Sequence, residues 1–395
     1  MCLLLRLTLL ALLLLLATVS AGPIENDELS DYEKTCRLHE KAIYNIGRFM
    51  NSGMPGNVKQ ETPCIPENVV AGTLPEERID YTNAVLCLQN KPARTHSTLA
   101  PGARSHFDDF TVTYMNQTLR LQYTGIFLSW HRYFTWAYEE ALRTECNYAG
   151  TQPYWDFAST ALDMTSSPLF DGSATSMSGN GAHIDQSGDV DFKLGPFPAI
   201  PLPHGDGGGC VTSGPFANMT INLGPVSLLL PGNKTASATD PYSHNPRCLK
   251  RDLGSAINGA YANATSIYKL LAEYDNIYDF QMTMQGIPGS GALGIHSAAH
   301  LTIGGDPGRD LFTAPSDPMF FLLHSEIDRL WWIWQALNIE DRLHAVAGTD
   351  TPLGGSPSAN VTLDTVINVG FAKEGDVRVG DLMSTVGGSF CYIYA

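Results

Sequence analysis

The sequence predicts a mainly α-helical protein with a central helical bundle, long loops and a small β-like C-terminal tail. Apolar residues recur three and four positions apart in several segments, which is the spacing of one buried helix face. The stretch from about 156 to 253 is instead rich in Gly, Ser, Pro and Asn, so we expect an insertion there without much regular structure. Beyond Leu343 the chain is rich in Gly, Thr and Val, which favours strands.

The first 21 residues have the pattern of a secretory signal peptide. Arg6 precedes a Leu-rich run, and Val19-Ser20-Ala21 supplies the small residues of a cleavage site. The alternative is a membrane anchor, for which the apolar run is short. We therefore expect a secreted protein, and no other stretch of the sequence predicts a membrane span.

The mature chain is strongly acidic. The formal net charge of the full sequence is −16, and removing Arg6 with the signal peptide makes that of the mature chain −17. Such a protein repels nucleic acid and anionic lipid, so we expect neither as a partner.

The cysteines and sequons agree with export. Seven cysteines follow the signal peptide, so one thiol is free, modified or intermolecular. If cysteines that are close in the sequence pair with each other, the expected disulfide bonds are Cys64 with Cys87 and Cys210 with Cys248. The glycosylation sequons begin at Asn116, Asn218, Asn233, Asn263 and Asn360.

Four segments before residue 290 have helical periodicity. They are Tyr32–Asn51, Pro75–Asn90, Phe127–Arg143 and residues 256–287. In the third, His131 shares an apolar stripe with Phe134, Tyr138 and Leu142. Taken alone, His131 is better explained as a packed core residue than as a metal ligand.

Three further histidines lie in two predicted helices joined by a Gly- and Pro-rich loop. His296 and His300 are four positions apart, so both imidazoles lie on one helix face. Asp317 and Pro318 have the character of an N-cap and a first helical residue, and the helix they begin carries His324. A helical hairpin would bring the three imidazoles together, and three neutral nitrogens suit copper or zinc.

Asp328, one turn after His324, has two interpretations. Its carboxylate could accept an N–H from a ligand histidine and so fix the tautomer. Alternatively, it forms an ordinary ion pair with Arg329. The histidines of the insertion, His183, His204 and His244, are expected to be surface residues rather than ligands.

Several stretches resemble the tyrosinase/catechol oxidase family of dicopper proteins, in particular its short secreted fungal members. They cover about a sixth of the chain. The matching sequences are TGIFLSWHRYFTWAYEEALRTEC from Thr124, QPYWDF from Gln152, HSAAHLTIGGDPGRDLF from His296 and DPMFFLLHSEIDRLWWIWQ from Asp317. The resemblance implies a four-helix bundle whose core histidines bind two copper ions. These ions use dioxygen to oxidise phenols or diphenols.

Carried over by position, the resemblance makes His296, His300 and His324 the ligands of the second copper. It makes His131 a ligand of the first. The other two first-copper positions carry Tyr114 and Gln122 instead of histidine.

Neither replacement is a good copper ligand. The amide of Gln122 offers a neutral oxygen, and the phenol of Tyr114, with an ordinary pKa of about 10, needs a strong Lewis acid to ionise. His106 could substitute only with a shifted backbone. We therefore expect a depleted first copper site.

The domain organisation that we expect is a signal peptide at 1–21, a copper domain at 22–345 and a short tail at 346–395. The tail is too short for the C-terminal cap domain that relatives often carry. The loops of the insertion would shape access to the site.

Three functions compete. The first is a copper oxidoreductase that oxidises a phenolic metabolite with dioxygen. The second is a non-catalytic copper-binding protein, such as a partner of an active homologue. Zinc hydrolysis is disfavoured because the residues between His296 and His300 are Ser, Ala and Ala, with no glutamate.

Overall fold

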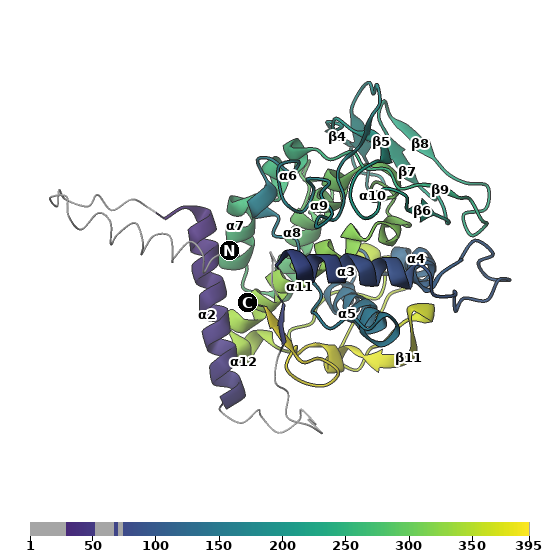
Figure 1. Cartoon of the computed structure of the whole chain (residues 1–395). Coiled ribbons are helices and arrows are strands. Elements are labelled where there is room, and N and C mark those ends of the chain that lie inside the picture. Colours follow the sequence, from purple (N-terminus) through teal and green to yellow (C-terminus); the bar gives the residue numbers. More distant parts are fainter. Residues whose placement is uncertain (1–28, 52–66, 70–73, 395) are drawn as a thin grey trace, which may run out of the picture.

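The computed structural model describes residues 29–51, 67–69 and 74–394, and it is mainly helical as predicted (Figure 1). The predicted signal peptide lies outside these residues, as does Cys64. Among the helices of the described ranges, none has the length and apolar character needed to cross a membrane.

The core is organised around α11, which is buried on every side. This helix packs against α5, α9 and α2. Its residues are buried without interruption from Met319 to Ala336, which is the behaviour of a helix at the centre of a domain. The central helices are α4 (His106–Gln117), α5 (Phe127–Cys146), α9 (Ile295–Ile303) and α11 (Met319–Leu337).

Local signals fix the ends of these helices. Ser105 begins α4 as an N-cap, because its hydroxyl accepts the backbone N–H of Asp108. Gly304 ends α9 with a φ of +62°, and a side chain there would bring its Cβ to 2.6 Å from the carbonyl oxygen of Asp252. The helix α11 begins at Met319, one residue later than predicted. Asp317 still accepts the backbone N–H of Met319, at 2.9 Å.

The remaining helices surround this core. Of these, α2 packs on α7 and α11, while α3 packs on α5. Their bounds are α2 (Asp31–Asn51), α3 (Pro75–Leu88), α6 (Ser255–Tyr261), α7 (Ala264–Glu273), α8 (Ile277–Gln285), α10 (Gly305–Gly308) and α12 (Ile339–Arg342). The helix predicted over 256–287 is thus three helices, because the side chains of Asn263 and Asn276 cap α7 and α8.

The Gly- and Pro-rich insertion has more regular structure than predicted. Its short strands form antiparallel pairs at the upper right of Figure 1. The pairs are β2 (Gly181–His183) with β5 (Gly208–Val211), β3 (Val190–Phe192) with β4 (Ile200–Leu202), β6 (Thr220–Ile221) with β9 (Arg247–Cys248), and β7 (Leu228–Leu230) with β8 (Lys234–Ala236).

The tail is strand-rich, as predicted. In it, β10 (Val366–Val369) pairs antiparallel with β11 (Lys373–Arg378), and β12 (Tyr392–Tyr394) pairs parallel with β1 (Glu67–Val69). The 3₁₀ helices of the described chain are η1 (Thr118–Arg120), η2 (Ala158–Thr160), η3 (Ala314–Ser316), η4 (Pro352–Gly354), η5 (Gly370–Ala372) and η6 (Val379–Leu382).

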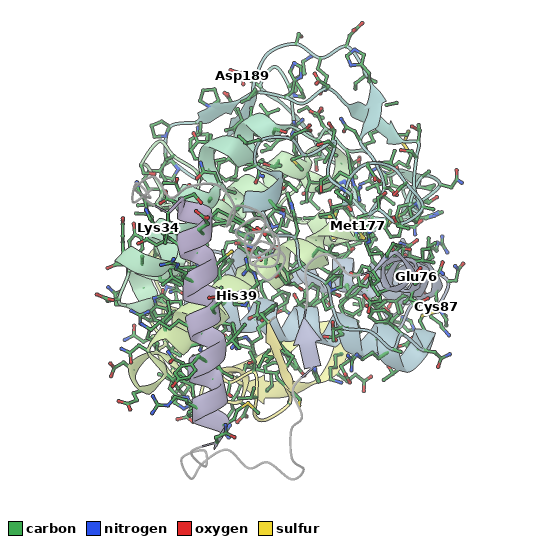
Figure 2. All side chains as sticks on the ribbon, turned by 60° about the vertical axis from the view of Figure 1, so that its left-hand side comes forward. Lys34, His39, Glu76, Cys87, Met177 and Asp189 are labelled. Atoms are coloured by element: carbon green, nitrogen blue, oxygen red, sulfur yellow. A yellow bond between two sulfur atoms is a disulfide. The ribbon has the colours of Figure 1, made fainter. Side chains whose placement is uncertain are left out.

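The disulfides agree with the sequence in part. The predicted bond between Cys210 and Cys248 is confirmed. The other pairing was wrong, because Cys87 (Figure 2) bonds to Cys146 and so joins the end of α3 to the end of α5. Each described cysteine is disulfide-bonded.

The helix α2 meets the C-terminal strand through His39, which Figure 2 labels on this helix. The Nε2 atom of His39 donates to the carbonyl oxygen of Tyr394 at 3.1 Å, and the ring packs edge-on against Trp332. Burial lowers the pKa of His39 to about 3, so the imidazole is neutral. The first described helix and the last described strand therefore stabilise each other over α11.

Neither interpretation of Asp328 was right. Its Oδ1 accepts from Nε of Arg132 at 2.5 Å, and its Oδ2 accepts the hydroxyls of Tyr392 and Tyr394 at 2.6 Å each. Arg329 pairs instead with Glu326, at 2.6 Å. Asp328 therefore joins α5 and the tail to α11 rather than orienting a ligand.

Changing Asp328 to Asn should destabilise the fold without changing the copper content of the folded protein. The change leaves Arg132 buried without its counter-charge, a loss of about 3–5 kcal/mol in the free energy of unfolding. Urea denaturation would measure this loss. The control is Asp381→Asn, which removes an exposed pair with Arg378 and should cost at most about 1 kcal/mol. Lost copper with unchanged stability would contradict this assignment.

Candidate metal centre

Three imidazoles converge where α9 meets α11. Nε2 of His300 lies 3.2 Å from Nε2 of His296 and 3.2 Å from Nε2 of His324. One ligand atom of each residue lies within 4.8 Å of those of the other two. The hairpin predicted from the sequence therefore brings these residues together, while their role as copper ligands stays a prediction.

The geometry of this group fits a metal ion. Nitrogens bound at about 2.0–2.1 Å to one tetrahedral ion lie about 3.3 Å apart, close to the separations found here. A neutral imidazole nitrogen carries at most one proton. Nε2 of His300 therefore offers either one N–H or one lone pair, which makes one well-directed hydrogen bond and leaves the other close contact poorly satisfied. A cation among the three nitrogens would turn these contacts into attractive ones.

The environment keeps these imidazoles neutral. Burial lowers the pKa of His300 to about 3, with a smaller contribution from His131. Burial, followed by the neighbouring histidines, lowers the pKa values of His296 and His324 well below the ordinary value. Since a metal binds the neutral ring, proton competition at neutral pH is weak.

Aromatic rings hold the imidazoles in position. Phe320 packs against His324 with a centroid separation of 4.2 Å, and Phe127 packs edge-on against His296 at 5.0 Å. Nδ1 of His324 has no hydrogen-bond partner among the described residues. This ring is therefore oriented by packing rather than by a carboxylate.

His131, on α5, lies beside the three but outside the group. Its ring stacks on that of His324 at 4.2 Å with an angle of 5° between planes. Nδ1 donates to the carbonyl oxygen of Phe127 at 2.7 Å, so the neutral ring has its lone pair on Nε2. That buried atom has no hydrogen-bond partner among the described residues. Burial lowers the pKa of His131 to about 4.

Tyr114 and Gln122 pair with each other next to His131. Nε2 of Gln122 donates to the hydroxyl of Tyr114 at 2.9 Å, and both side chains are buried. The ring of Tyr114 packs edge-on against His131 at 5.9 Å. Burial raises the pKa of the Tyr114 phenol, so it is neutral and a weak metal ligand.

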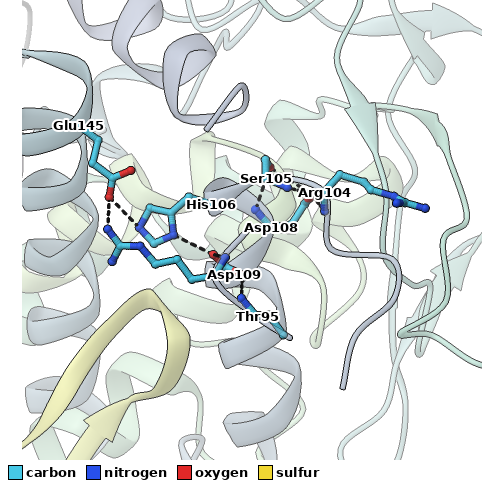
Figure 3. Close-up of polar contacts among 8 residues, drawn as sticks. Thr95, Arg104, Ser105, His106, Asp108, Asp109 and Glu145 are labelled. Atoms are coloured by element: carbon cyan, nitrogen blue, oxygen red, sulfur yellow. Dashed lines mark hydrogen bonds and ion pairs between the residues drawn. The ribbon is translucent and has the colours of Figure 1, made fainter. Parts of the chain in front are cut away.

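His106 does not take the place of a missing ligand (Figure 3). Its Nδ1 lies 2.8 Å from Oδ2 of Asp109, and its Nε2 lies 3.3 Å from Oε1 of Glu145. Asp109 also accepts the backbone N–H groups of Arg94 and Thr95. Asp109 therefore engages Nδ1 and Glu145 lies close to Nε2, so His106 is committed between α4 and the end of α5.

A cavity of about 140 Å³ adjoins the metal centre, with His296 and His300 in its wall. Its apolar wall comes partly from the insertion, whose loops were predicted to shape access. The lining includes Gln122, Phe192, Lys193, Leu229, Gln285, Leu301 and Phe312. No motif in the sequence indicated Lys193 or Gln285. A larger cavity of about 300 Å³, lined by Tyr81, Tyr148 and Trp155, includes none of the four histidines.

Comparison with known proteins identifies the family. The common central domain of tyrosinase matches residues 104–337. Tyrosinase P of Aspergillus terreus is 38% identical over 323 residues, which cover 81% of this chain and 88% of the relative. Oxidase hkm6 of Aspergillus hancockii is 41% identical over 292 residues, with coverage of 73% and 99%.

A solved structure agrees over most of the chain. A variant polyphenol oxidase from Thermothelomyces thermophila is 40% identical, has a TM-score of 0.86 and is covered to 98%, with 92% of this chain aligned. The domain match, the curated relatives and this structure identify the chain as a member of the tyrosinase family of copper oxidoreductases.

Proposed function

We propose that this protein binds one copper ion through His296, His300 and His324 and oxidises a phenolic or related aromatic metabolite with dioxygen. The observation that carries the proposal is the convergence of three neutral imidazoles beside a mainly apolar cavity. Bound copper would supply the redox chemistry with dioxygen. A relative with aromatic chemistry in its name is N-acetyl-6-hydroxytryptophan oxidase ivoB of Emericella nidulans, 35% identical over 333 residues with coverage of 81% and 89%.

The chain's own residues would bind the substrate, exclude water and hold the ligands. Phe192, Leu229 and Leu301 give the cavity an apolar wall suited to an aromatic ring. Phe127 and Phe320 fix the planes of the imidazoles. Nδ1–H of His131 donates to the carbonyl oxygen of Phe127, which keeps the lone pair on Nε2.

The first copper site is depleted in this proposal. Tyr114 and Gln122 are neutral, and they satisfy each other by a hydrogen bond of 2.9 Å. Of the side chains at the three first-site positions, only the imidazole of His131 is a good copper ligand. A single imidazole is too few for tight binding of a second ion.

A second candidate function is a non-catalytic copper-binding protein, for example a partner of an active homologue. The hydrogen bond between Tyr114 and Gln122 also favours it. A lone copper exchanges one electron between its common states, whereas reduction of dioxygen to peroxide takes two. Oxygen uptake with phenols distinguishes the functions: steady copper-dependent uptake supports the oxidoreductase, and binding without uptake supports the partner.

Purified protein loaded with copper should retain about one ion per chain after dialysis. Changing His300 to Ala should remove most of this binding, because two imidazoles hold the ion far less tightly than three. Metal analysis by mass spectrometry measures the ratio. His183→Ala is the control, since its side chain is exposed in the insertion. Two tightly held ions per chain would show that the first site is not depleted.

The double change Tyr114→His with Gln122→His should create a second copper site. Tyr114 packs against His131 and Gln122 hydrogen-bonds to Tyr114, and replacing them together avoids leaving one member of the buried pair without its partner. We expect two coppers per chain and a gain in catechol turnover and oxygen consumption. The single variants are the matched controls and should bind one copper. If the double variant still binds one, these positions do not face a common site.

We also propose that the protein is exported. All described cysteines are disulfide-bonded, which suits an oxidising compartment, and the sequon residues Asn116, Asn218, Asn233 and Asn360 are exposed. Expression in a yeast should release protein whose N-terminus follows Ala21 and whose mass falls after glycosidase treatment. Retention in the cell with residues 1–21 intact would rule out cleavage and release.

A further inference from the structure

We propose that the cavity beside His296 and His300 selects single-ring aromatic carboxylates, with the ammonium group of Lys193 binding the carboxylate. The proposal rests on the proposed function in taking this cavity as the substrate site. It goes further because it names the charge of the substrate and the residue that binds the charged group.

Lys193 is the charged residue of the described cavity lining whose side chain makes no hydrogen bond or ion pair with another described residue. Its side chain is exposed. The other charged lining residues are engaged. Arg309 donates to Asp252 at 2.7 Å, and Asp310 accepts the backbone N–H of Val226 at 2.6 Å.

The lining of the cavity combines two kinds of polar group. The imidazole of His296 is buried, while the side chain of Lys193 is exposed. Phe192 and Leu301 contribute apolar wall, and an engineered apolar cavity of about 150 Å³ accepts benzene. A volume of about 140 Å³ therefore suits one aromatic ring, with a polar group toward the imidazoles and an anionic group toward the solvent.

The negative charge of the whole protein makes a cation at the cavity important for binding an anionic substrate. A net charge of −16 repels anions at long range. Attraction of an anionic substrate then needs a local cation at the cavity itself. A neutral phenol would gain nothing from Lys193, whereas an aromatic acid would gain a charge-assisted hydrogen bond.

A matched pair of ligands isolates the effect of charge. Calorimetric titration of the copper-loaded and the metal-free protein with 4-hydroxybenzoate and 4-hydroxybenzamide gives the dissociation constants, since these molecules share a ring and a hydroxyl. The wild-type protein should bind the acid about 2- to 5-fold more tightly than the amide, the range of an exposed ion pair. This preference should shrink as salt is added.

Variants test whether Lys193 is the source. Lys193→Met should remove the preference and leave amide binding unchanged, and Lys193→Glu should reverse it. The control is Lys41→Met, an exposed lysine on α2 that changes the net charge equally and should keep the preference. Equal binding of the two ligands to the wild type, a preference that survives Lys193→Met, or no binding of either would overturn the proposal.

The experiment separates this inference from the proposed function. A Lys193-dependent preference without oxygen uptake would keep the binding proposal and reject the oxidoreductase. Copper-dependent oxidation of neutral phenols without preference for the acid would keep the oxidoreductase and reject the binding proposal.

Discussion

The fold depends on the burial of α11, a helix that brings charged side chains into the core. A buried charge is tolerated only with a partner, and two of these partners come from other elements, which must therefore stay close. Asp328 holds Arg132 of α5, and Asp317, just before the helix, holds Arg251 of the insertion at 2.8 Å. These pairs fix α5 and the insertion against the helix that carries His324, so the metal centre inherits its geometry from them.

Two neighbouring groups of polar side chains show opposite solutions to burial. In the first group, Nε2 of His300 lies 3.2 Å from the Nε2 atoms of both His296 and His324, an arrangement that a cation stabilises. Tyr114 and Gln122 instead complete each other by a hydrogen bond and need no ion. Burial favours neutral side chains in both groups, which differ in whether a single hydrogen bond satisfies the close polar contacts.

The sequence predicted what depends on local spacing. The hairpin with His296 and His300 followed from helical periodicity, and the strand-rich tail from composition. The sequence did not predict the partner of Asp328, because Arg132 lies 196 positions away and Tyr394 lies 66 away. The helix breaks at Asn263 and Asn276 were also missed, because capping outweighed a continuous apolar pattern there. Lys193 was missed as well, because only the folded insertion brings this residue to the cavity.

The bonds of Asp328 also bear on the order of events during synthesis. The carboxylate is made long before Tyr392 and Tyr394, whose hydroxyls complete its hydrogen bonds. Until translation has passed residue 394, α11 must hold a carboxylate that Arg132 alone satisfies, and α2 lacks the carbonyl that His39 binds. The centre of the domain can therefore reach its final packing only after the tail has been synthesised. The hydrogen bonds from Tyr392 and Tyr394 are then the last contacts that the helix carrying His324 gains.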